Sequence, residues 1–218
     1  GIRKYGFHGT SHKYVSQRVA ELVGKPVKEL KTVVCHLGQG ASLCAVKGGK
    51  SVDTSMGFTP LAGIAMGTRS GDLDPSIVTF LMREEELDPD EIDKILNKES
   101  GILGMSEISG DNRDLAASIK NKDENAEKAK MALETYTYII AQYIAKYAVA
   151  LNGIDVIAFA GGVGERGFNE RKMICDKLQW MGVDLDYKVN RKTIAEEKEI
   201  SKPDSKVKVW VVPTEEEL

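Results

Sequence analysis

The sequence predicts an α/β protein whose mixed sheet is opened by three antiparallel strands and flanked by helices. Two β-branched, apolar runs, Thr32–Leu37 and Ala41–Val46, precede the turn Gly48-Gly49 and a third run, Ser51–Asp53. Apolar runs joined by glycine turns are typical of antiparallel hairpins. The later run Ile154–Ala160 is apolar along nearly its whole length, as expected of a strand that is buried on both faces of a parallel sheet.

Length and composition favour a soluble globular protein of one large domain or two small ones. The chain has 218 residues, of which 42% are hydrophobic and 29% are charged, so a sizeable core can form. Its 30 basic and 33 acidic residues leave a net charge of −3, which indicates neither a nucleic-acid nor a membrane partner. No apolar run approaches the ~18 residues of a membrane span, and the start, GIRKYGFHG, is not a signal peptide.

The cysteines favour a cytoplasmic protein. Cys35, Cys44 and Cys175 are an odd number and lack CxxC spacing. This pattern indicates buried thiols in a reducing compartment and gives no sign of a zinc site.

Helices are predicted where apolar residues at helical spacing follow capping residues. Thr10 or Ser11 can cap a helix that ends at Gly24. Asp74-Pro75 and Asp88-Pro89 each begin another helix, because proline is well suited to the first helical position.

The C-terminal half continues the α/β pattern. The stretch 100–115 contains glycines and leads into a polar helix, and the longest helical pattern covers Asp123–Asn152. A glycine turn after the Ile154–Ala160 strand leads into one further helix. We expect an edge hairpin or loop over 186–206 and a last strand over Val207–Val212.

The segment Thr54–Pro75 is organised around one arginine. Its glycines and prolines exclude a long helix or strand, and its Met, Phe, Leu and Ile make it too apolar for a solvated linker. We expect a structured loop over a core, which can hold Arg69 in a partly dry place. A guanidinium there suits phosphate or carboxylate oxygens, whereas the alternative is a surface ion pair between Arg69 and Asp72.

Two glycine-rich turns are candidate phosphate sites. Gly38 and Gly40, in HLGQG, let backbone N–H groups converge on an anion. Gly161, Gly162 and Gly164 stand where a helix N-terminus can meet a nucleotide phosphate or ribose. A glycine-rich hairpin is also often only a turn, and the second spacing is not GxGxxG, so no dinucleotide site is inferred.

Three further sites allow a structural and a functional interpretation. His8 and His12 flank the start of the first helix and are either hydrogen-bonded structural histidines or neutral groups that face an anion. Residues 111–113 form a helix-capping turn in the structural interpretation, whereas in the functional one Arg113 could stack on a purine. Residues 215–217 either place favourable charge at a helix N-terminus or provide a carboxylate for Mg²⁺.

Six motifs occur in order from one end of the chain to the other. They are YGFHGTSH (Tyr5–His12), CHLGQGAS (Cys35–Ser42), MGFTPLAGIAMGTRSGDLDP (Met56–Pro75), SGDNRDL (Ser109–Leu115), AGGVGE (Ala160–Glu165) and VPTEEEL (Val212–Leu218). As a set they are specific, and the chain resembles the acetate kinase family, the acetate and propionate/butyrate kinases. The resemblance implies the actin-like ATPase and sugar-kinase (ribonuclease H-like) fold, in which three antiparallel strands open each half.

The resemblance implies reversible phosphoryl transfer from ATP to acetate, which gives acetyl phosphate and ADP with the help of Mg²⁺ or Mn²⁺. His8 matches the family's catalytic histidine and, with Arg69, would hold the transferring phosphoryl group. Glu216 would help to place the nucleotide-bound metal. The nucleotide would be bound by residues of three motifs: His36, Leu37, Gly38, Gln39 and Gly40; Asp111, Asn112 and Arg113; and Gly162, Val163, Gly164, Glu165 and Arg166.

The chain departs from the family pattern at three positions. Gln39 and Glu215 each replace a common asparagine, and Arg166 stands where asparagine usually follows the Gly-Glu pair. Arg166 brings a new charge to the nucleotide pocket. These changes affect individual contacts and leave the implied reaction class unchanged.

The start of the chain suggests a fragment, because there is no initiating Met and the first motif begins almost at once. We expect residues 1–218 to be a C-terminal nucleotide-binding domain that is truncated at both ends. The other phosphate loop, a second arginine and the catalytic Asp of the family would lie before Gly1, so we expect little activity from this chain alone. The resemblance also implies a homodimer.

Other functions stay open. A propionate or butyrate kinase of the same family would carry the same motifs, and a nucleotide-binding module could use them without catalysis. A sugar or glycerol kinase would require a longer insertion for a polyol pocket, and the sequence shows none.

Overall fold

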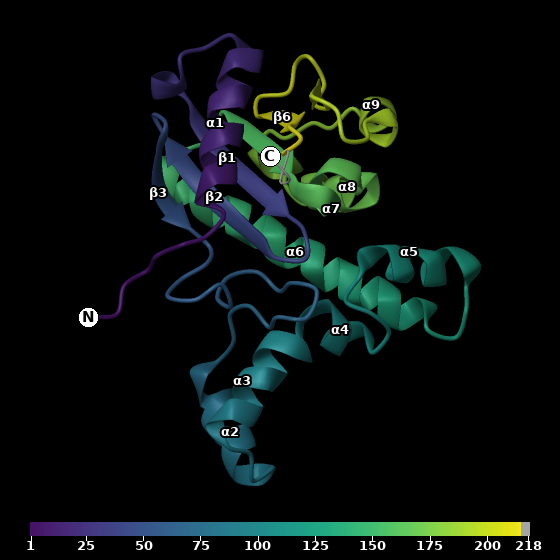
Figure 1. The fold of residues 1–218 in the computed structure, drawn as a ribbon. Coiled ribbons are helices and arrows are strands. Elements are labelled where there is room, and N and C mark those ends of the chain that lie inside the picture. Colours follow the sequence, from purple (N-terminus) through teal and green to yellow (C-terminus); the bar gives the residue numbers. More distant parts are fainter. Residues whose placement is uncertain (215–218) are drawn as a thin grey trace.

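A computed structural model describes residues 1–214, and a six-stranded mixed sheet with the order β3-β2-β1-β4-β6-β5 forms its centre (Figure 1). β1, β2 and β3 are antiparallel, β1, β4 and β6 run parallel, and β5 pairs antiparallel with β6. The predicted mixed sheet, opened by three antiparallel strands, is therefore confirmed. The strands are β1 (Lys31–Leu37), β2 (Ala41–Lys47), β3 (Lys50–Thr54), β4 (Val156–Ala160), β5 (Lys198–Glu199) and β6 (Lys208–Val211).

Helices cover both faces of this sheet. The described helices are α1 (Gly9–Val23), α2 (Pro75–Glu84), α3 (Pro89–Lys98), α4 (Gly101–Ser106), α5 (Asn112–Asn121), α6 (Ala126–Leu151), α7 (Gly161–Arg166), α8 (Phe168–Asp176) and α9 (Tyr187–Lys192), with 3₁₀ turns at Val27–Glu29 and Gln179–Met181. Within the described residues, no helix is both long and apolar enough to span a membrane.

Successive side chains of β1 point to opposite faces of the sheet and so belong to two separate layers of the core. Val33 and Cys35 belong to a large cluster with α6, whereas Val34 belongs to a smaller cluster with α1. Figure 1 shows α1 and α6 on opposite faces of the sheet. All five residues of β4 are buried, as predicted for a strand covered on both sides. Cys35, Cys44 and Cys175 are buried too, and desolvation raises the pKa of each thiol, to about 12 for Cys175.

The two Asp-Pro pairs begin helices as predicted. The Asp74 side chain accepts a hydrogen bond from the Ser76 N–H, and Asp88 forms a reciprocal capping box with Glu91. In Figure 1, α2 and α3 extend away from the sheet as an arm. Ile92 is the only buried residue in these two helices.

Several element boundaries differ from the sequence predictions. α1 begins at Gly9, so His8, not Thr10 or Ser11, occupies the N-cap position, with a left-handed φ of 58°. The His8 ring is hydrogen-bonded to Ser42 of β2, and the chain enters the helix directly after this contact. α4 was not predicted.

The region after β4 also differs. The glycine motif is itself helical, and Gly167 separates α7 from α8 where one helix was expected. Within 186–206 the expected edge hairpin is present as β5, which pairs with β6, but this stretch also contains α9. The sequence pattern missed α9 because its six residues are too few to show helical periodicity.

Candidate functional site

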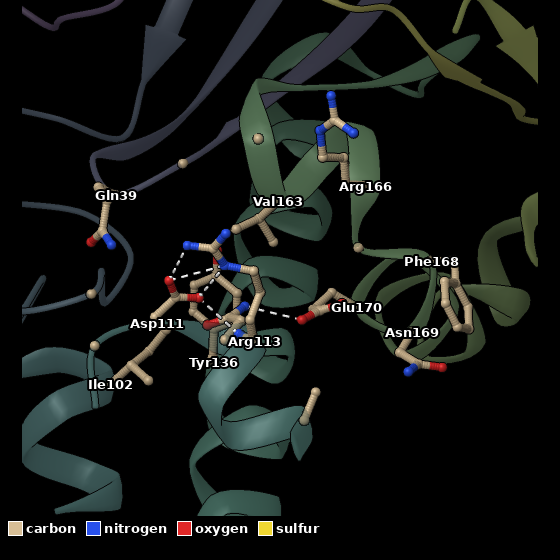
Figure 2. Close-up of a pocket in the computed structure, with 17 residues that line it drawn as sticks. Gln39, Ile102, Asp111, Arg113, Tyr136, Val163, Arg166, Phe168, Asn169 and Glu170 are labelled. Carbon is tan, nitrogen blue, oxygen red and sulfur yellow. Dashed lines mark hydrogen bonds and ion pairs between the residues drawn. The ribbon is translucent and has the colours of Figure 1, made fainter. Parts of the chain in front are cut away.

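A cavity of about 480 Å³ opens between the end of β1, the start of α5 and the pair α7–α8. Eight of the residues predicted to bind nucleotide line it: Gly38, Gln39, Asp111, Asn112, Arg113, Gly162, Val163 and Arg166. Figure 2 shows Asp111, Arg113 and Val163 facing one another, with Gln39 to one side and Phe168 and Asn169 to the other. Motifs more than 120 residues apart in the sequence therefore meet at one site.

The α5 wall of the cavity is built on a helix cap. Asp111 is the N-cap of α5 and accepts a hydrogen bond of 2.8 Å from the Arg113 N–H. The Arg113 side chain returns to the same carboxylate, with 2.6 Å from Nη2 to Oδ2, and this contact lowers the pKa of Asp111. The capping interpretation is therefore confirmed as local structure, and the same residues also line the cavity.

The α7–α8 wall is held from inside the protein. Arg171 is fully buried and donates five hydrogen bonds, to Oδ1 and the carbonyl of Asn190 and to the carbonyls of Gly164, Glu165 and Thr193. Desolvation lowers the pKa of Arg171 to about 10, so the side chain remains a cation at pH 7. One buried cation thus joins the end of α7 to α9.

Glu165 belongs to the interior of the same wall. Its Oε1 accepts hydrogen bonds from the N–H groups of Gly161, at 3.0 Å, and Thr214, at 2.9 Å. The buried carboxylate therefore stabilises the first turn of α7 and fixes the chain that leaves β6. Glu165 does not line the cavity; neither do Gly164, which packs against Phe159, or Leu37, which belongs to the core.

Arg166 lines the cavity with an exposed side chain. Figure 2 shows its guanidinium directed away from the Asp111–Arg113 pair. Asn112 points inward instead and donates a hydrogen bond of 3.2 Å to Glu170 of α8, which joins the two walls.

A cluster of three histidines lies beside the cavity, at the end of β1. His8 Nδ1 and His12 Nε2 lie 2.9 and 2.8 Å from the hydroxyl of Ser42, and His36 Nδ1 lies 2.8 Å from that of Ser11. The rings of His8 and His36 stack, with centroids 4.1 Å apart. Burial, followed by the nearby His36, lowers the pKa of His8 to about 4 and that of His12 to about 3.

Arg69 meets this cluster at Gly40. A methyl group built on Gly40 would lie 3.5 Å from Arg69 Nη1 and 3.6 Å from His8 Nε2, so these two groups border the same space. The Arg69 side chain is half-buried, and its Nη1 donates a hydrogen bond of 3.2 Å to the Pro60 carbonyl.

The predicted alternative, a pair between Arg69 and Asp72, is not present. Asp72 instead accepts hydrogen bonds from the N–H of Gly63, at 2.8 Å, and from the hydroxyl of Tyr143. The expected structured loop is confirmed, because Met66 is buried and its N–H is bonded to the Arg69 carbonyl. Arg69 thus keeps donors for a ligand in a partly dry place.

The model of the acetokinase family matches residues 1–218. The chain belongs to this family. An acetate kinase of Dictyoglomus thermophilum is 56% identical over 217 residues, which are 100% of this chain and 53% of that relative. The chain spans about half the length of the curated relatives it matches.

Solved structures of the family show the same fold. The crystal structure of Porphyromonas gingivalis acetate kinase matches with a TM-score of 0.95 and 46% identity, over 99% of this chain and 53% of that one. A propionate kinase from Francisella tularensis matches with a TM-score of 0.90 and 40% identity, over 99% of this chain and 54% of that one. The predicted acetate kinase family and its fold are therefore confirmed.

Residues 1–214 contain no metal site that is formed by protein side chains alone. Within 1–214, no group of three or more His, Cys, Asp or Glu side chains is placed to hold an ion. Two carboxylates line the cavity: Asp111 pairs with Arg113 and caps α5, and Glu170 accepts a hydrogen bond from Asn112. Glu216, which was predicted to serve the metal, lies outside the described residues, as does Glu215.

Sequence analysis missed two residues that organise the site. Arg171 stands in the polar stretch NERK, where nothing distinguishes a buried arginine from an exposed one. Ser42 could have been found, because residues 42, 44 and 46 lie on one face of the buried strand β2. Since Cys44 and Val46 belong to that face, Ser42 must face α1 as well.

Proposed function

We propose that this chain is the nucleotide-binding C-terminal domain of an acetate kinase. The whole enzyme would transfer a phosphoryl group reversibly between ATP and acetate, giving ADP and acetyl phosphate. The observation that carries this proposal is the meeting of His8 and Arg69 at Gly40, beside a cavity lined by the family's other motifs. Phosphoryl transfer depends mainly on positioning and charge neutralisation, which this arrangement provides.

The nucleotide would lie in the cavity. Arg113 and Asp111 would contact the nucleoside, while Gly162 and Val163 would let its ribose or phosphates approach the α7 backbone closely. His36 and Gly38–Gly40 would lie beside the phosphates, because Gly38 and Gln39 line the cavity and Gly40 borders His8 and Arg69. Leu37, Gly164 and Glu165 would act from the core by holding these loops.

His8 and Arg69 would bind the transferring phosphoryl group. Arg69 supplies a permanent positive charge and fork-like donors for its equatorial oxygens. With a pKa of about 4, His8 is neutral at pH 7 and contributes a hydrogen bond instead of a second charge. The remaining groups of the active site would come from the other part of the enzyme, so this chain alone would have little or no kinase activity.

Several features of the whole enzyme belong to the same proposal. Mg²⁺ would be bound mainly by nucleotide phosphates and water, as this ion prefers, with Glu216 as the protein carboxylate. The enzyme would be a cytoplasmic homodimer. The exposed Ile77 and Phe80 of α2, a helix without buried residues, support a partner surface on the α2–α3 arm.

A propionate or butyrate kinase is the second candidate, because a propionate kinase matches with a TM-score of 0.90. Residues that contact the acyl chain would lie largely in the other part of the enzyme. Comparing acetate, propionate and butyrate as substrates of the full-length protein would decide between these acids.

Calorimetric titration of this chain with MgADP tests the proposed nucleotide site. Arg113→Ala removes a side chain at the cavity. Gly162→Ala adds a methyl that meets no atom within 4 Å beyond its chain neighbours and the backbone of its own helix, so it should act mainly on the ligand. Arg191→Ala, on the exposed side of α9, is the matched control. We expect both cavity variants to weaken saturable binding at least several-fold, and the control to leave it unchanged.

Two results would overturn parts of this proposal. Absence of binding by a chain that melts cooperatively would show that the described cavity does not bind nucleotide by itself. Appreciable acetyl phosphate formation by the isolated chain would contradict the incomplete active site. A full-length protein that binds MgADP but lacks any acetate-dependent activity would instead favour a nucleotide-binding module.

A further inference from the structure

Ser42 lies between two histidines and has a single proton to share. Its hydroxyl is 2.9 Å from His8 Nδ1 and 2.8 Å from His12 Nε2, and the side chain is fully buried. A serine hydroxyl donates one hydrogen bond and accepts up to two. The direction of one of these contacts therefore determines the direction of the other.

The far nitrogen of His12 distinguishes the possible arrangements. Among the described residues, His12 Nδ1 is buried and has no hydrogen-bond partner. If Ser42 donated to His12, the proton of neutral His12 would be on Nδ1 and would be an orphaned buried donor, which is rare in proteins. If both histidines donated to Ser42, the hydroxyl proton would itself lack an acceptor.

One arrangement leaves no buried proton without an acceptor. His12 Nε2–H donates to Ser42, and the Ser42 hydroxyl donates to His8 Nδ1. The proton of neutral His8 is then on Nε2, which borders the same space at Gly40 as Nη1 of Arg69. Both histidines are neutral at pH 7, since their pKa values are about 4 and about 3.

We propose that Ser42 and His12 are positioning residues that fix the tautomer of His8, so that its Nε2–H donates to an oxygen of the transferring phosphoryl group. This inference rests on the proposed function for the role of the donor, but the tautomer itself does not depend on it. The stacked His36 and the cation Arg69 also face His8, and both disfavour its protonated form. Ser42 thus determines which nitrogen of His8 carries the proton, whereas His36 and Arg69 keep the ring neutral.

The tautomer can be read from ¹⁵N correlation spectra of the histidine rings at pH 7. The chain has three histidines, so the spectrum of selectively labelled protein is simple, and a His8→Gln variant assigns the signal. We expect His8 to carry its proton on Nε2 in the wild type and to show mixed tautomers in Ser42→Ala. Ser11→Ala is the matched control, because Ser11 contacts His36 and not His8.

A second variant tests the hydrogen bonds from His12 through Ser42 to His8 without removing the serine. His12→Gln keeps an amide N–H that can donate to Ser42, so the His8 tautomer should be retained. A wild-type His8 protonated on Nδ1, or a His8 signal that is unchanged in Ser42→Ala, would overturn the inference.

Kinetics of the full-length protein test what the tautomer does. Ser42→Ala should lower kcat by at least about 10-fold with little change in nucleotide KM, up to the roughly 10⁴-fold loss seen when a catalytic imidazole loses its tautomer-setting partner. An unchanged kcat together with an altered tautomer would overturn the link to phosphoryl transfer. Absence of acetate-dependent activity in the wild type would instead overturn the proposed function.

Discussion

Each wall of the cavity carries one arginine, and the two arginines have opposite environments. On the α7–α8 wall, Arg171 is fully buried and donates five hydrogen bonds, all to neutral oxygens of Gly164, Glu165, Asn190 and Thr193. On the α5 wall, the side chain of Arg113 is 89% exposed and contacts the carboxylate of Asp111. The first arginine holds the backbone of the site together, whereas the second is available to a ligand.

This difference shows how one cavity can combine a fixed and an adjustable wall. A buried cation is costly unless all its donors are used, so Arg171 allows only one arrangement of α7, α8 and α9. An exposed ion pair is held weakly, so Arg113 is free to leave Asp111 for the nucleoside that we propose to bind here. We expect stability to depend on the first wall and affinity on the second.

Arg171→Met should have the largest effect on stability. It removes the guanidinium donor of the Gly164 and Thr193 carbonyls and of Asn190 Oδ1, at roughly 1 kcal/mol or more each. The carbonyls of Glu165 and Asn190 also lose this donor but keep backbone N–H donors, from Ala195 and Thr193. We therefore expect the free energy of unfolding in urea to fall by about 3–5 kcal/mol. Arg191→Ala, a nearby exposed arginine on α9, should leave the urea midpoint unchanged. A loss below about 1 kcal/mol in Arg171→Met would break the comparison.

Glu165→Ala should have an intermediate effect. It removes the acceptor of the buried Gly161 N–H and of the part-buried Thr214 N–H, and the loss of these two hydrogen bonds costs about 2 kcal/mol. Glu165→Gln keeps an oxygen in the same place and should lose less than half as much. Urea unfolding of both variants checks this, and an equal loss in the two would mean that the charge, not the hydrogen bonds, stabilises this wall.

Arg113→Ala should have the smallest effect on stability and a clear effect on binding. Because its side chain is in solvent, the urea midpoint should stay that of the wild type, while the affinity for MgADP should fall several-fold. Parallel urea and calorimetric titrations measure both quantities on the same preparation. A destabilised variant with unchanged affinity would reverse the roles assigned to the two walls.

Much of the fold could be predicted because local chemistry agrees with the final structure. The hairpin at Gly48-Gly49 and the Asp-Pro starts of α2 and α3 are examples of such agreement. α4 and α9 could not be predicted, since each has only six residues and depends on tertiary contacts. At Gly101, for example, φ is +62° and any added methyl would collide with the Met66 carbonyl, which only the folded loop reveals.

Only those site residues that belong to a family motif could be predicted from the sequence. The cavity unites Gly38, Arg113 and Gly162 as the resemblance implied, and His8 lies next to Arg69. The inward orientation of Glu165 and the burial of Arg171 depend on partners at Thr214 and on α9. A charged residue carries no sign in the sequence of whether it will face water or a set of carbonyls.

The burial of all three cysteines makes this chain convenient for site-specific labelling. Labelling requires an accessible thiolate, which is the nucleophile that attacks the reagent. Cys35, Cys44 and Cys175 are buried, and desolvation raises the pKa of each thiol. A cysteine introduced in place of the exposed Arg191 of α9 would react far faster than any of them. A single fluorophore or spin label could therefore be attached there without first removing the native cysteines.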